Sequence, residues 1–467
     1  MIFIDSLVFQ HVRNAREGNI DFDDFSQKVI EKSEKIQKKY LPFVTLVEKP
    51  VKPEKKGKLF YLPISVKDCI CTEGIQSSAG SKILKGYVPP FDATSVRKVR
   101  DEGVFILGKT NQDEFGFGTF SINSGYDIPR NPLDPERSAG GSSGGAACLT
   151  AVADFPHVAL AESTGGSISS PAAFTGTVGL TPTYGRVSRW GLIDYANSMD
   201  KIGVIGKCVN DVALIFSAIS GHDPLDSTSL DIPDEDFTKN LNQPIKGMKA
   251  GVPKEYFEEG VDEKIKKIVW QGIKKLENLG VDIKEVSLPH TKYSVASYYI
   301  IAVCEASTNL SKYCGMRYGL HEPLDGNFDE YFSKVREDGF GEEAKRRIIL
   351  GTYARMAGYR NAYYLKALKV RTKIIEDFKT AFKNVDVLLA PSMPVIAPKF
   401  KEIEKLEPID HYMMDILTLG PNLAGIPMLS VPCGAVNGMP VGMHILADHL
   451  KEKNIFKIAS SFEKVKK

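Results

Sequence analysis

The 467-residue sequence has few cysteines, almost no excess charge and no long hydrophobic run. Its seven cysteines are odd in number and scattered, with only Cys69 and Cys71 close together, which favours reduced thiols in a cytoplasmic protein over a disulfide scaffold. The 60 Lys and Arg residues against 58 Asp and Glu residues leave a net charge of +2, so the chain lacks the basic excess of proteins that hold nucleic acid by themselves. No run approaches about 18 uncharged apolar residues, and the first residues lack a secretory-signal pattern, so we expect no association with a membrane.

What the sequence does contain is an alternation of strand and helix patterns. LPISV at 62–66 and VFIL at 104–107 predict buried strands, and the helical pattern at 94–103 between them predicts a parallel strand–helix–strand unit. The alternation returns later, with strands expected over 248–253, 281–288, 385–392, 429–433 and 441–446 and helices over 262–280 and 360–382. Together these patterns predict an α/β fold: one large domain whose mixed central β-sheet is covered by helices on both faces.

The same organisation predicts domain boundaries. Residues 1–50 are expected to be helical, with Phe25, Val29, Ile30 and Ile36 on one side. We expect an N-terminal helical segment over 1–60 that packs on the core, followed by a main α/β domain over 61–445. Insertions into this domain are expected at approximately 225–260 and 285–350, and a C-terminal helix is expected over 446–467.

A stretch over 116–191 is dense in Gly, Ser, Thr and Ala. Such a composition is typical of flexible linkers, but buried-looking segments such as HVALA at 157–161 interrupt it. We therefore expect closely packed backbone in this stretch.

Two motifs suggest chemistry that their context argues against. GVFILGKT at 103–110 fits the phosphate-loop pattern, but its middle residues are apolar and strand-forming where a loop with inward N–H groups is needed. GGSSGG at 140–145 contains G-x-S-x-G, but no strand pattern precedes it, as a hydrolase elbow requires. The eight histidines form no HExxH or other closely spaced ligand pair, so we expect no metal site.

Three features remain that can carry chemistry. Lys67 follows a buried strand, GGSSGG places serines on glycine-flanked backbone, and Gly165 and Gly166 precede Ser167. Two glycines before a serine permit a tight group of N–H donors, which suits an oxyanion. A serine needs a base to become a nucleophile, and a buried lysine can serve where no histidine is well placed.

These motifs belong to a larger pattern that resembles the amidase signature family of Ser–Ser–Lys amidohydrolases. The resemblance covers most of residues 61–205 and returns near 415–445. The segments that carry it are LPISVKDCICTEGIQSSAGS, GKTNQDEFGFG, RNPLDPERSAGGSSGGAA, STGGSISSPAAFTGTVGLTPTYGRVSRWGLI and NLAGIPMLSVPCG. The chain is also similar to the A subunits of tRNA-dependent amidotransferases in PTYGRVSRWGLI within this core, and outside it in DSTSLD, EASTNLSKYCGMRYG, GFGEEAKRRIILGTYA and YYLKALKVRTKIIEDF.

The resemblance implies a catalytic triad. Ser167 would be the nucleophile, Ser142 the bridging serine that follows a cis peptide bond, and Lys67 the base that takes a proton through Ser142. The backbone N–H groups of Thr164, Gly165, Gly166 and Ser167 would form the oxyanion hole. Glutamine would then form a glutamyl ester on Ser167, release ammonia and be freed as glutamate by water.

The resemblance also implies substrate-binding residues. Arg347 would bind the α-carboxylate of glutamine, Asp415 its α-ammonium group, and Tyr298 would form a wall of the site. Arg346 is adjacent to Arg347, so either arginine fits the carboxylate role. A structural ion pair for Arg347, a helix cap for Asp415 and core packing for Tyr298 remain alternatives.

The sequence departs from the family at the nucleophile segment. The family usually reads Asp-Thr-Gly-Gly-Ser-Ile-Arg, whereas Ser163 and Ser169 replace the Asp and the Arg here. Our hypothesis is that two complementary charges were lost together, which leaves the loop differently braced but intact. Restoring them singly and jointly tests this pairing.

The first functional hypothesis is therefore a glutaminase subunit whose ammonia converts misacylated Glu-tRNA(Gln) to its amidated form, with Asp-tRNA(Asn) left open as a second substrate. The resemblance implies that this chain binds no cofactor, that a B subunit holds the tRNA and uses ATP with Mg²⁺, and that a small C subunit wraps the interface. The second hypothesis is a free-standing amidase that keeps Lys67, Ser142 and Ser167 but acts on another amide. The third is a non-catalytic scaffold subunit, against which the intact serines and lysine argue.

Overall fold

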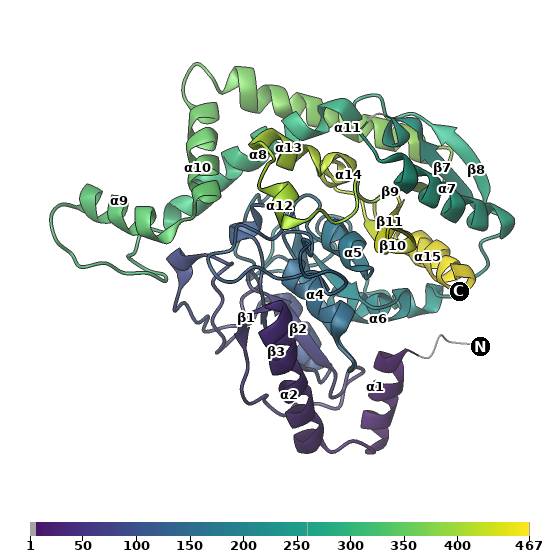
Figure 1. The fold of residues 1–467 in the computed structure, drawn as a ribbon, viewed down its shortest axis with the longest axis horizontal. Helices are drawn as coiled ribbons and strands as arrows, with labels where there is room; N and C mark the ends of the chain where they lie inside the picture. Colours follow the sequence, from purple (N-terminus) through teal and green to yellow (C-terminus); the bar gives the residue numbers. More distant parts are fainter. Residues whose placement is uncertain (1–5, 259, 467) are drawn as a thin grey trace.

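An eleven-stranded mixed β-sheet runs through the computed structural model, which describes residues 6–258 and 260–466 (Figure 1). The strands, in their order across the sheet, are β1 (Phe43–Leu46), β3 (Phe105–Thr110), β2 (Pro63–Lys67), β4 (Val158–Ser163), β6 (Lys201–Gly206), β5 (Val178–Thr181), β10 (Met428–Val436), β11 (Met439–Leu446), β9 (Val387–Pro391), β7 (Lys249–Pro253) and β8 (Asp282–Val286). Strand β2 is parallel to both β3 and β4, whereas β4, β6, β5, β10, β11 and β9 pair antiparallel in turn. The predicted α/β class with a mixed central sheet is confirmed.

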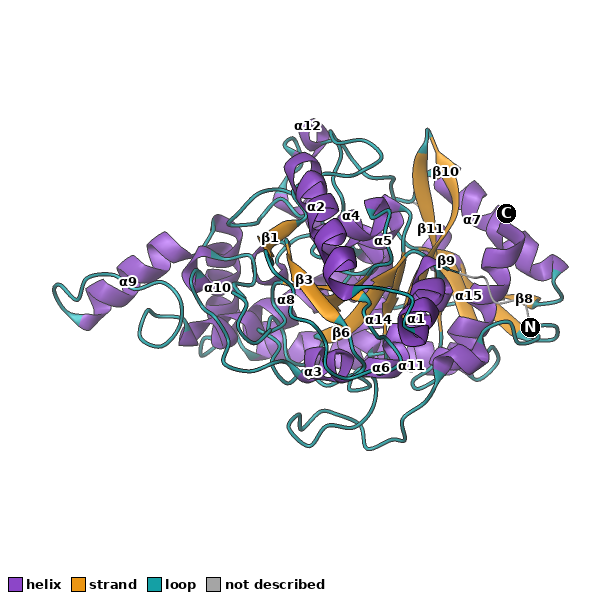
Figure 2. Ribbon diagram, turned by 90° about the horizontal axis from the view of Figure 1, so that it is seen from below, coloured by secondary structure: helices purple, strands orange, loops and turns teal. Residues whose placement is uncertain are grey.

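Helices cover both faces of this sheet. Figure 2 shows α2, α4 and α5 on one side of the strands and α3 and α6 on the other. The helices are α1 (Leu7–Glu17), α2 (Phe22–Tyr40), α3 (Thr94–Asp101), α4 (Gly144–Val152), α5 (Ser169–Thr175), α6 (Val209–Ile219), α7 (Glu263–Asn278), α8 (Ser294–Asn309), α9 (Phe328–Gly339), α10 (Glu342–Arg355), α11 (Lys366–Phe382), α12 (Phe400–Ile403), α13 (Pro408–Met413), α14 (Ile416–Ala424) and α15 (Glu452–Lys466).

The glycine- and alanine-rich stretch is closely packed, as predicted. Alanines of α4 and β4 form a buried cluster with Ile168 and Ile205. A Cβ atom on Gly179 would lie within 3.0 Å of side-chain atoms of Ile168 and Ala172, so α5 can approach the sheet this closely only because the strand carries glycine there. Small side chains thus bring the loop before α5 down onto the strand ends.

The N-terminal segment differs in part from its prediction. Asp21 caps α2 by accepting a hydrogen bond from the N–H of Asp24, and Val29 and Ile30 are buried against the rest of the protein. The predicted helix over 1–50 is wrong at residues 43–46, because Phe43 turns inward and these residues pair with β3 as a sheet edge. The domain boundaries given above stay predictions.

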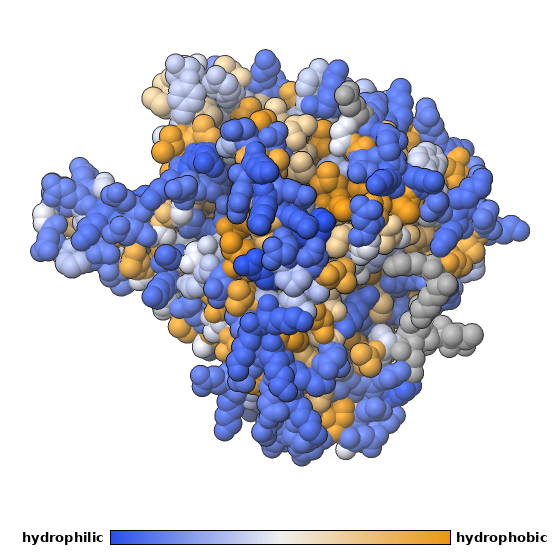
Figure 3. Space-filling model, in the orientation of Figure 1, coloured by the Kyte–Doolittle hydropathy of each residue, from blue (hydrophilic) through white to orange (hydrophobic). Residues whose placement is uncertain are grey.

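Helices α8, α10 and α11 pack together on one side of the molecule, and α9 projects from its body (Figure 1). The surface seen in that orientation is mostly hydrophilic, with hydrophobic residues in patches between charged ones (Figure 3). Over the two described ranges, no helix combines the length and the apolar character needed to span a bilayer.

Lys201, at the start of β6, provides a prediction for stability. Its side chain is buried, and burial, followed by the charge of Arg371, lowers its pKa to about 7. An unfolded chain keeps this proton to about pH 10, whereas the folded chain releases it near pH 7, so this group makes the unfolding free energy rise between those pH values. We expect the unfolding free energy of wild type minus that of Lys201→Met to increase by about 2–4 kcal/mol from pH 7 to pH 10. Denaturant titrations of both proteins at each pH measure this difference, and a constant difference would contradict the prediction.

Candidate active site

Lys67 lies at the carboxyl end of β2, in the interior of the protein. Because β2 and β4 are parallel, their carboxyl ends meet at the same edge of the sheet. The Lys67 amine therefore reaches three acceptors: Ser142 Oγ at 2.7 Å, the Glu162 main-chain oxygen at 3.0 Å and Glu162 Oε2 at 2.8 Å. The Lys67 side chain is 0% exposed. Lys67 therefore does not extend into solvent from the end of the strand. Its amine is held in the interior by a serine, a carboxylate and a carbonyl.

Ser142 lies in the glycine-rich turn before α4. The peptide bond between Gly141 and Ser142 is cis, as the resemblance implied. A Cβ atom on Gly141 would come within 3.0 Å of Asp113 and of the main-chain nitrogens of Phe120 and Ser121. Only glycine fits there, so GGSSGG is a packing motif that carries Ser142 to the lysine amine.

Ser167 lies in the loop between β4 and α5. The carbonyl oxygens of this loop are held by neighbours: Gly165 by the Ser163 hydroxyl and the Asn422 amide, Gly166 by the Ser170 N–H, and Ser167 by the Ser143 N–H. The N–H groups of Thr164, Gly165, Gly166 and Ser167 donate to no acceptor among the described residues. A loop with bound carbonyls and free N–H groups beside a serine is the arrangement that an oxyanion hole requires.

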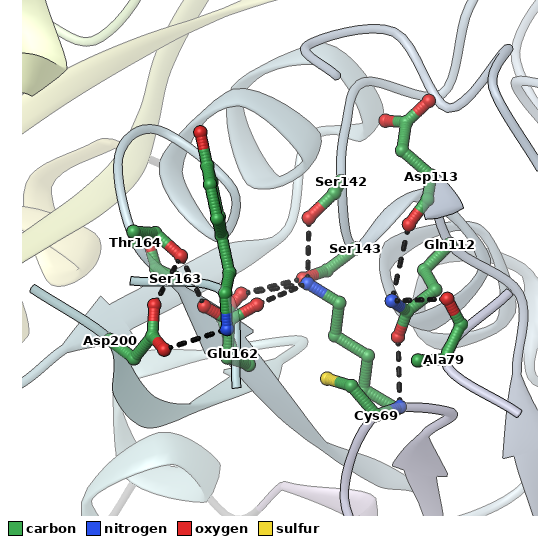
Figure 4. Close-up of polar contacts among 12 residues, drawn as sticks. Cys69, Ala79, Gln112, Asp113, Ser142, Ser143, Glu162, Ser163, Thr164 and Asp200 are labelled. Carbon is green, nitrogen blue, oxygen red and sulfur yellow. Dashed lines mark hydrogen bonds and ion pairs between the residues drawn. The ribbon is translucent and has the colours of Figure 1, made fainter. Parts of the chain in front are cut away.

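Two carboxyl groups that the sequence analysis missed complete this cluster (Figure 4). Glu162 pairs with Lys67, and the Thr164 hydroxyl lies 2.8 Å from Glu162 Oε1 and 2.7 Å from Asp200 Oδ1. The available signal was Glu162 itself, a charged residue at the end of an otherwise apolar strand, VALAES. The alternation of side chains along a strand did not indicate that the Glu162 side chain reaches Lys67.

No histidine hydrogen-bonds to Ser142, Ser143 or Ser167 in the part of the chain that the structure describes. Burial lowers the pKa of His157 and of His444 to about 3, so both are neutral at physiological pH. Within residues 6–258 and 260–466, no three His, Cys, Asp or Glu side chains form a group that could hold a metal ion.

Arg347 lies on α10 within a cluster of aromatic rings. Its Nε donates to Glu343 at 2.7 Å, its Nη1 donates to the Tyr195 hydroxyl, and its guanidinium lies over the rings of Phe117 and Tyr299. Burial opposes its charge, but Tyr195 and Glu343 outweigh burial and hold the pKa of Arg347 above its ordinary value. Its Nη2 donates to no acceptor in the described residues, so one of its three nitrogens is unbonded there. A structural ion pair with Glu343 therefore explains the hydrogen bond of Nε but not the unbonded Nη2.

Asp415 joins the aromatic cluster to the nucleophile loop. Its Oδ2 accepts hydrogen bonds from Thr119 at 2.8 Å and from Tyr299 at 3.2 Å. Its Oδ1 is buried with no partner in the described chain, and it would lie 2.8 Å from a Cβ atom on Gly166. Burial raises the pKa of Asp415 to about 6. Asp415 directly precedes α14, but its side chain makes no capping hydrogen bond, so the helix-cap alternative does not explain it.

A cavity of 240 Å³ lies beside these residues. Arg346, Arg347, Thr119 and Tyr299 are among its lining residues, and Ser167 is not. Asp415 connects the two, since its carboxylate contacts Thr119 on the cavity wall and Gly166 in the loop. Of the predicted substrate residues, Arg347 thus lines the cavity itself, and Asp415 lies between the cavity wall and the loop that carries Ser167.

Tyr298 and Arg346 are placed differently from Arg347. Tyr298 is buried, and its hydroxyl lies against Gly165 of the nucleophile loop, while the neighbouring Tyr299 lines the cavity. Arg346 is 43% exposed and forms an ion pair with Glu343. Both arginines line the cavity, but only Arg347 is buried, and its Nη2 donates to no acceptor among the described residues.

Ser163 and Ser169 are both buried, where the family has two charges. The Ser163 hydroxyl donates to the Gly165 carbonyl at 2.8 Å, and Ser163 lies opposite Lys201 in the β4–β6 pair. The Ser169 hydroxyl has no partner in the described residues. We expect Ser169→Arg alone to lower the unfolding free energy by about 3–5 kcal/mol, because it buries an unpaired cation. Ser163→Asp with Ser169→Arg should be more stable than Ser169→Arg alone in denaturant titrations. The hypothesis of paired charges fails if the double variant is no better than the worse single one.

Comparison with known proteins shows similarity over most of the chain. The Amidase family model matches residues 28–456. The A subunit of the glutamyl-tRNA(Gln) amidotransferase of Persephonella marina is 46% identical over 95% of this chain and 89% of its own, and that of Carboxydothermus hydrogenoformans is 50% identical over 89% and 85%. The crystal structure of the corresponding subunit of Thermotoga maritima superposes with a TM-score of 0.80 at 38% identity, covering 94% of this chain and 91% of its own. The native peptide amidase of Stenotrophomonas maltophilia has a TM-score of 0.78 at 25% identity, covering 99% and 97%. The chain therefore belongs to the amidase family.

Proposed function

We propose that this chain is the glutamine-hydrolysing subunit of a tRNA-dependent amidotransferase. The observation that carries the proposal is the Lys67–Ser142 hydrogen bond beside a loop with free N–H groups, next to a cavity lined by Arg347. The identity to two subunits named for glutamyl-tRNA(Gln) amidotransferase, over most of each chain, supports the same conclusion.

In the proposed reaction Ser167 attacks the side-chain amide carbon of glutamine. As the bond to Ser167 Oγ forms, its proton passes to Ser142 and the Ser142 proton passes to Lys67. The N–H groups of residues 164–167 stabilise the negative oxygen of the tetrahedral intermediate. The proton then returns through Ser142 to the leaving nitrogen, which departs as ammonia, and water hydrolyses the ester by the same steps in reverse.

Glutamine selection follows from the two charged groups. The Arg347 Nη2, which donates to no acceptor among the described residues, is suited to the α-carboxylate of the substrate, because hydrogen bonds between a charged donor and a carboxylate are strong. The unpartnered Asp415 Oδ1 is suited to the α-ammonium group, which would also satisfy a buried acceptor. Tyr298 supports the nucleophile loop from behind and shapes this wall of the site.

We further propose that partner subunits supply the remaining chemistry. A B subunit would hold the misacylated tRNA and use ATP with Mg²⁺, a small C subunit would wrap the interface, and ammonia would pass from this chain to the tRNA-bound carboxylate. The near-neutral net charge of this chain supports an arrangement in which another subunit binds most of the nucleic acid.

The second candidate is a free-standing amidase, which the fold similarity to the peptide amidase keeps open. It shares Lys67, Ser142 and Ser167 with the first candidate but has no need of Arg347 or Asp415. The two candidates therefore differ in substrate, not in the bond-breaking step.

The test is glutamate release from glutamine by the purified chain, alone and with the B and C subunits plus misacylated tRNA, with Ser167→Ala as the control. Release that depends on Ser167 and rises with the partners supports the proposal. No release in any mixture, together with Ser167-dependent hydrolysis of simple amides, would assign the chain as a free-standing amidase.

A further inference from the structure

Lys67 has a negatively charged partner within hydrogen-bonding distance. Its Nζ lies 2.8 Å from Glu162 Oε2, and the two side chains are 0% and 4% exposed. An opposite charge this close, in a region closed to solvent, favours the charged form of an amine. A lysine that carries its proton cannot accept another one from Ser142, so this pair bears directly on the proposed reaction.

The hydrogen bonds of Thr164 indicate how many protons the two neighbouring carboxyl groups hold. Its hydroxyl lies 2.8 Å from Glu162 Oε1 and 2.7 Å from Asp200 Oδ1, but it has only one hydrogen to donate. Both contacts are hydrogen bonds only if one of the two carboxyl groups is protonated and donates to Thr164. Burial, and then the charge of Glu162, raise the pKa of Asp200 to about 7. Of the two carboxyl groups, Asp200 is placed to hold that proton, because Glu162 Oε2 pairs with the Lys67 amine.

Other titratable groups around the pair do not replace Glu162. Asp113 interacts with Lys67 electrostatically, but its carboxylate is bound by the N–H groups of Ser121 and Asn123, and burial raises its pKa to about 6. Burial raises the pKa of Cys69 and raises that of Tyr195 to about 12, so both are neutral at physiological pH. Glu162 is the group whose charge lies in contact with the amine.

We propose that Glu162 is a positioning residue that sets the charge of Lys67 and thereby the pH at which Ser167 becomes a nucleophile, with Thr164 and Asp200 holding the Glu162 carboxyl group in place. The inference rests on the proposed Ser–Ser–Lys chemistry and deepens it. The ion pair of Lys67 with Glu162 is the state from which the reaction starts. Lys67 first loses one proton to a solvent base. The neutral amine then accepts the Ser167 proton through Ser142, and that proton leaves with ammonia.

The test is the pH profile of Glu162→Gln, which keeps the shape of the side chain and removes its charge. Two readouts are used between pH 5.5 and 10: kcat/KM for glutamine with the partner subunits, and the rate at which phenylmethylsulfonyl fluoride labels Ser167, followed by intact mass. We expect the acid limb of both profiles to move down by about one to three pH units. The plateau should also fall, because Lys67 exchanges a charged acceptor for a neutral one, but the position of the limb is read independently of the plateau height.

Three further variants support the interpretation. Glu162→Asp keeps the charge and should leave the limb within about half a unit of wild type. Glu452→Gln is the matched control, since Glu452 is also a buried glutamate but binds the N–H of Thr183 away from this cluster. Glu162→Met removes the charge without adding an amide dipole. It replaces Glu162→Gln in the same two assays if Glu162→Gln does not show a cooperative melting transition.

The outcomes separate this inference from the function on which it rests. An acid limb that moves in neither Glu162→Gln nor Glu162→Met, in protein that still labels at Ser167, would overturn the role of Glu162. A limb that moves equally in Glu452→Gln would also overturn it. Labelling with the expected shift but without glutamine hydrolysis in any mixture would leave the role of Glu162 standing and count against the proposed substrate.

Discussion

Ser167→Ala should lower glutamine hydrolysis by a factor of about 10⁴ to 10⁶, the largest effect of any single change we expect in this chain. The variant loses the atom that forms the acyl bond, and nothing else in the described site can replace it, since the Ser142 hydroxyl is engaged with Lys67. The free N–H groups of the loop would remain, so a small residual rate above that in water is expected.

The triad prediction extends to pairs of changes. Ser142→Ala and Lys67→Met should each cost about 10³-fold or more, and Ser167→Ala combined with either should be no slower than Ser167→Ala alone, because the three residues act as a unit. Ammonia release measured by a coupled assay gives the rates. Ser170→Ala is the control, since it removes a buried neighbouring hydroxyl that bonds only to the Thr119 carbonyl. A Ser167→Ala variant within tenfold of wild type would mean that another group is the nucleophile.

The second large effect is expected at Arg347, and it concerns substrate choice. Removing one member of a buried charge pair typically costs about 2–5 kcal/mol, so Arg347→Met should lower kcat/KM for glutamine by a factor of about 30 to 4,000. Hydrolysis of a small uncharged amide should change less than about fivefold, because the bond-breaking residues Lys67, Ser142 and Ser167 are untouched. The ratio of the two substrates is therefore the measured quantity.

Arg346→Met is the matched comparison for this prediction. Arg346 lines the same cavity, but it is 43% exposed and bonded to Glu343, so we expect less than about a fivefold loss for glutamine. A larger loss at position 346 than at 347 would assign the carboxylate role to Arg346. Equal losses for glutamine and the uncharged amide in Arg347→Met would favour the free-standing amidase, or a purely structural role for the aromatic cluster.

The chemistry of the site was predictable from the sequence because its main residues lie in short local motifs. Lys67 ends a recognisable strand, and Ser142 and Ser167 lie in glycine-rich segments whose composition permits only close packing or a loop. The same local reasoning failed at residues 43–46, because strand pairing with β3 outweighed the helical pattern before it. It also gave no reason to connect Glu162 or Asp200 with Lys67, although each is close to a motif residue.

By itself, the sequence determined the α/β class and the strand–helix–strand unit around 62–107, and it singled out Lys67, Ser142 and Ser167 as candidates through the resemblance of their motifs to the amidase signature family. Those features depend on periodicity and on local motifs, which are written in contiguous residues. Only the tertiary structure decided that Glu162 is the charged partner of Lys67, that Asp415 connects the cavity to the nucleophile loop, and that Arg347 rather than Arg346 is buried among aromatic rings. These features depend on which strand ends meet and which side of a helix faces the sheet. A charge acts according to its distance from other groups and its burial, and local sequence determines neither the distance nor the burial.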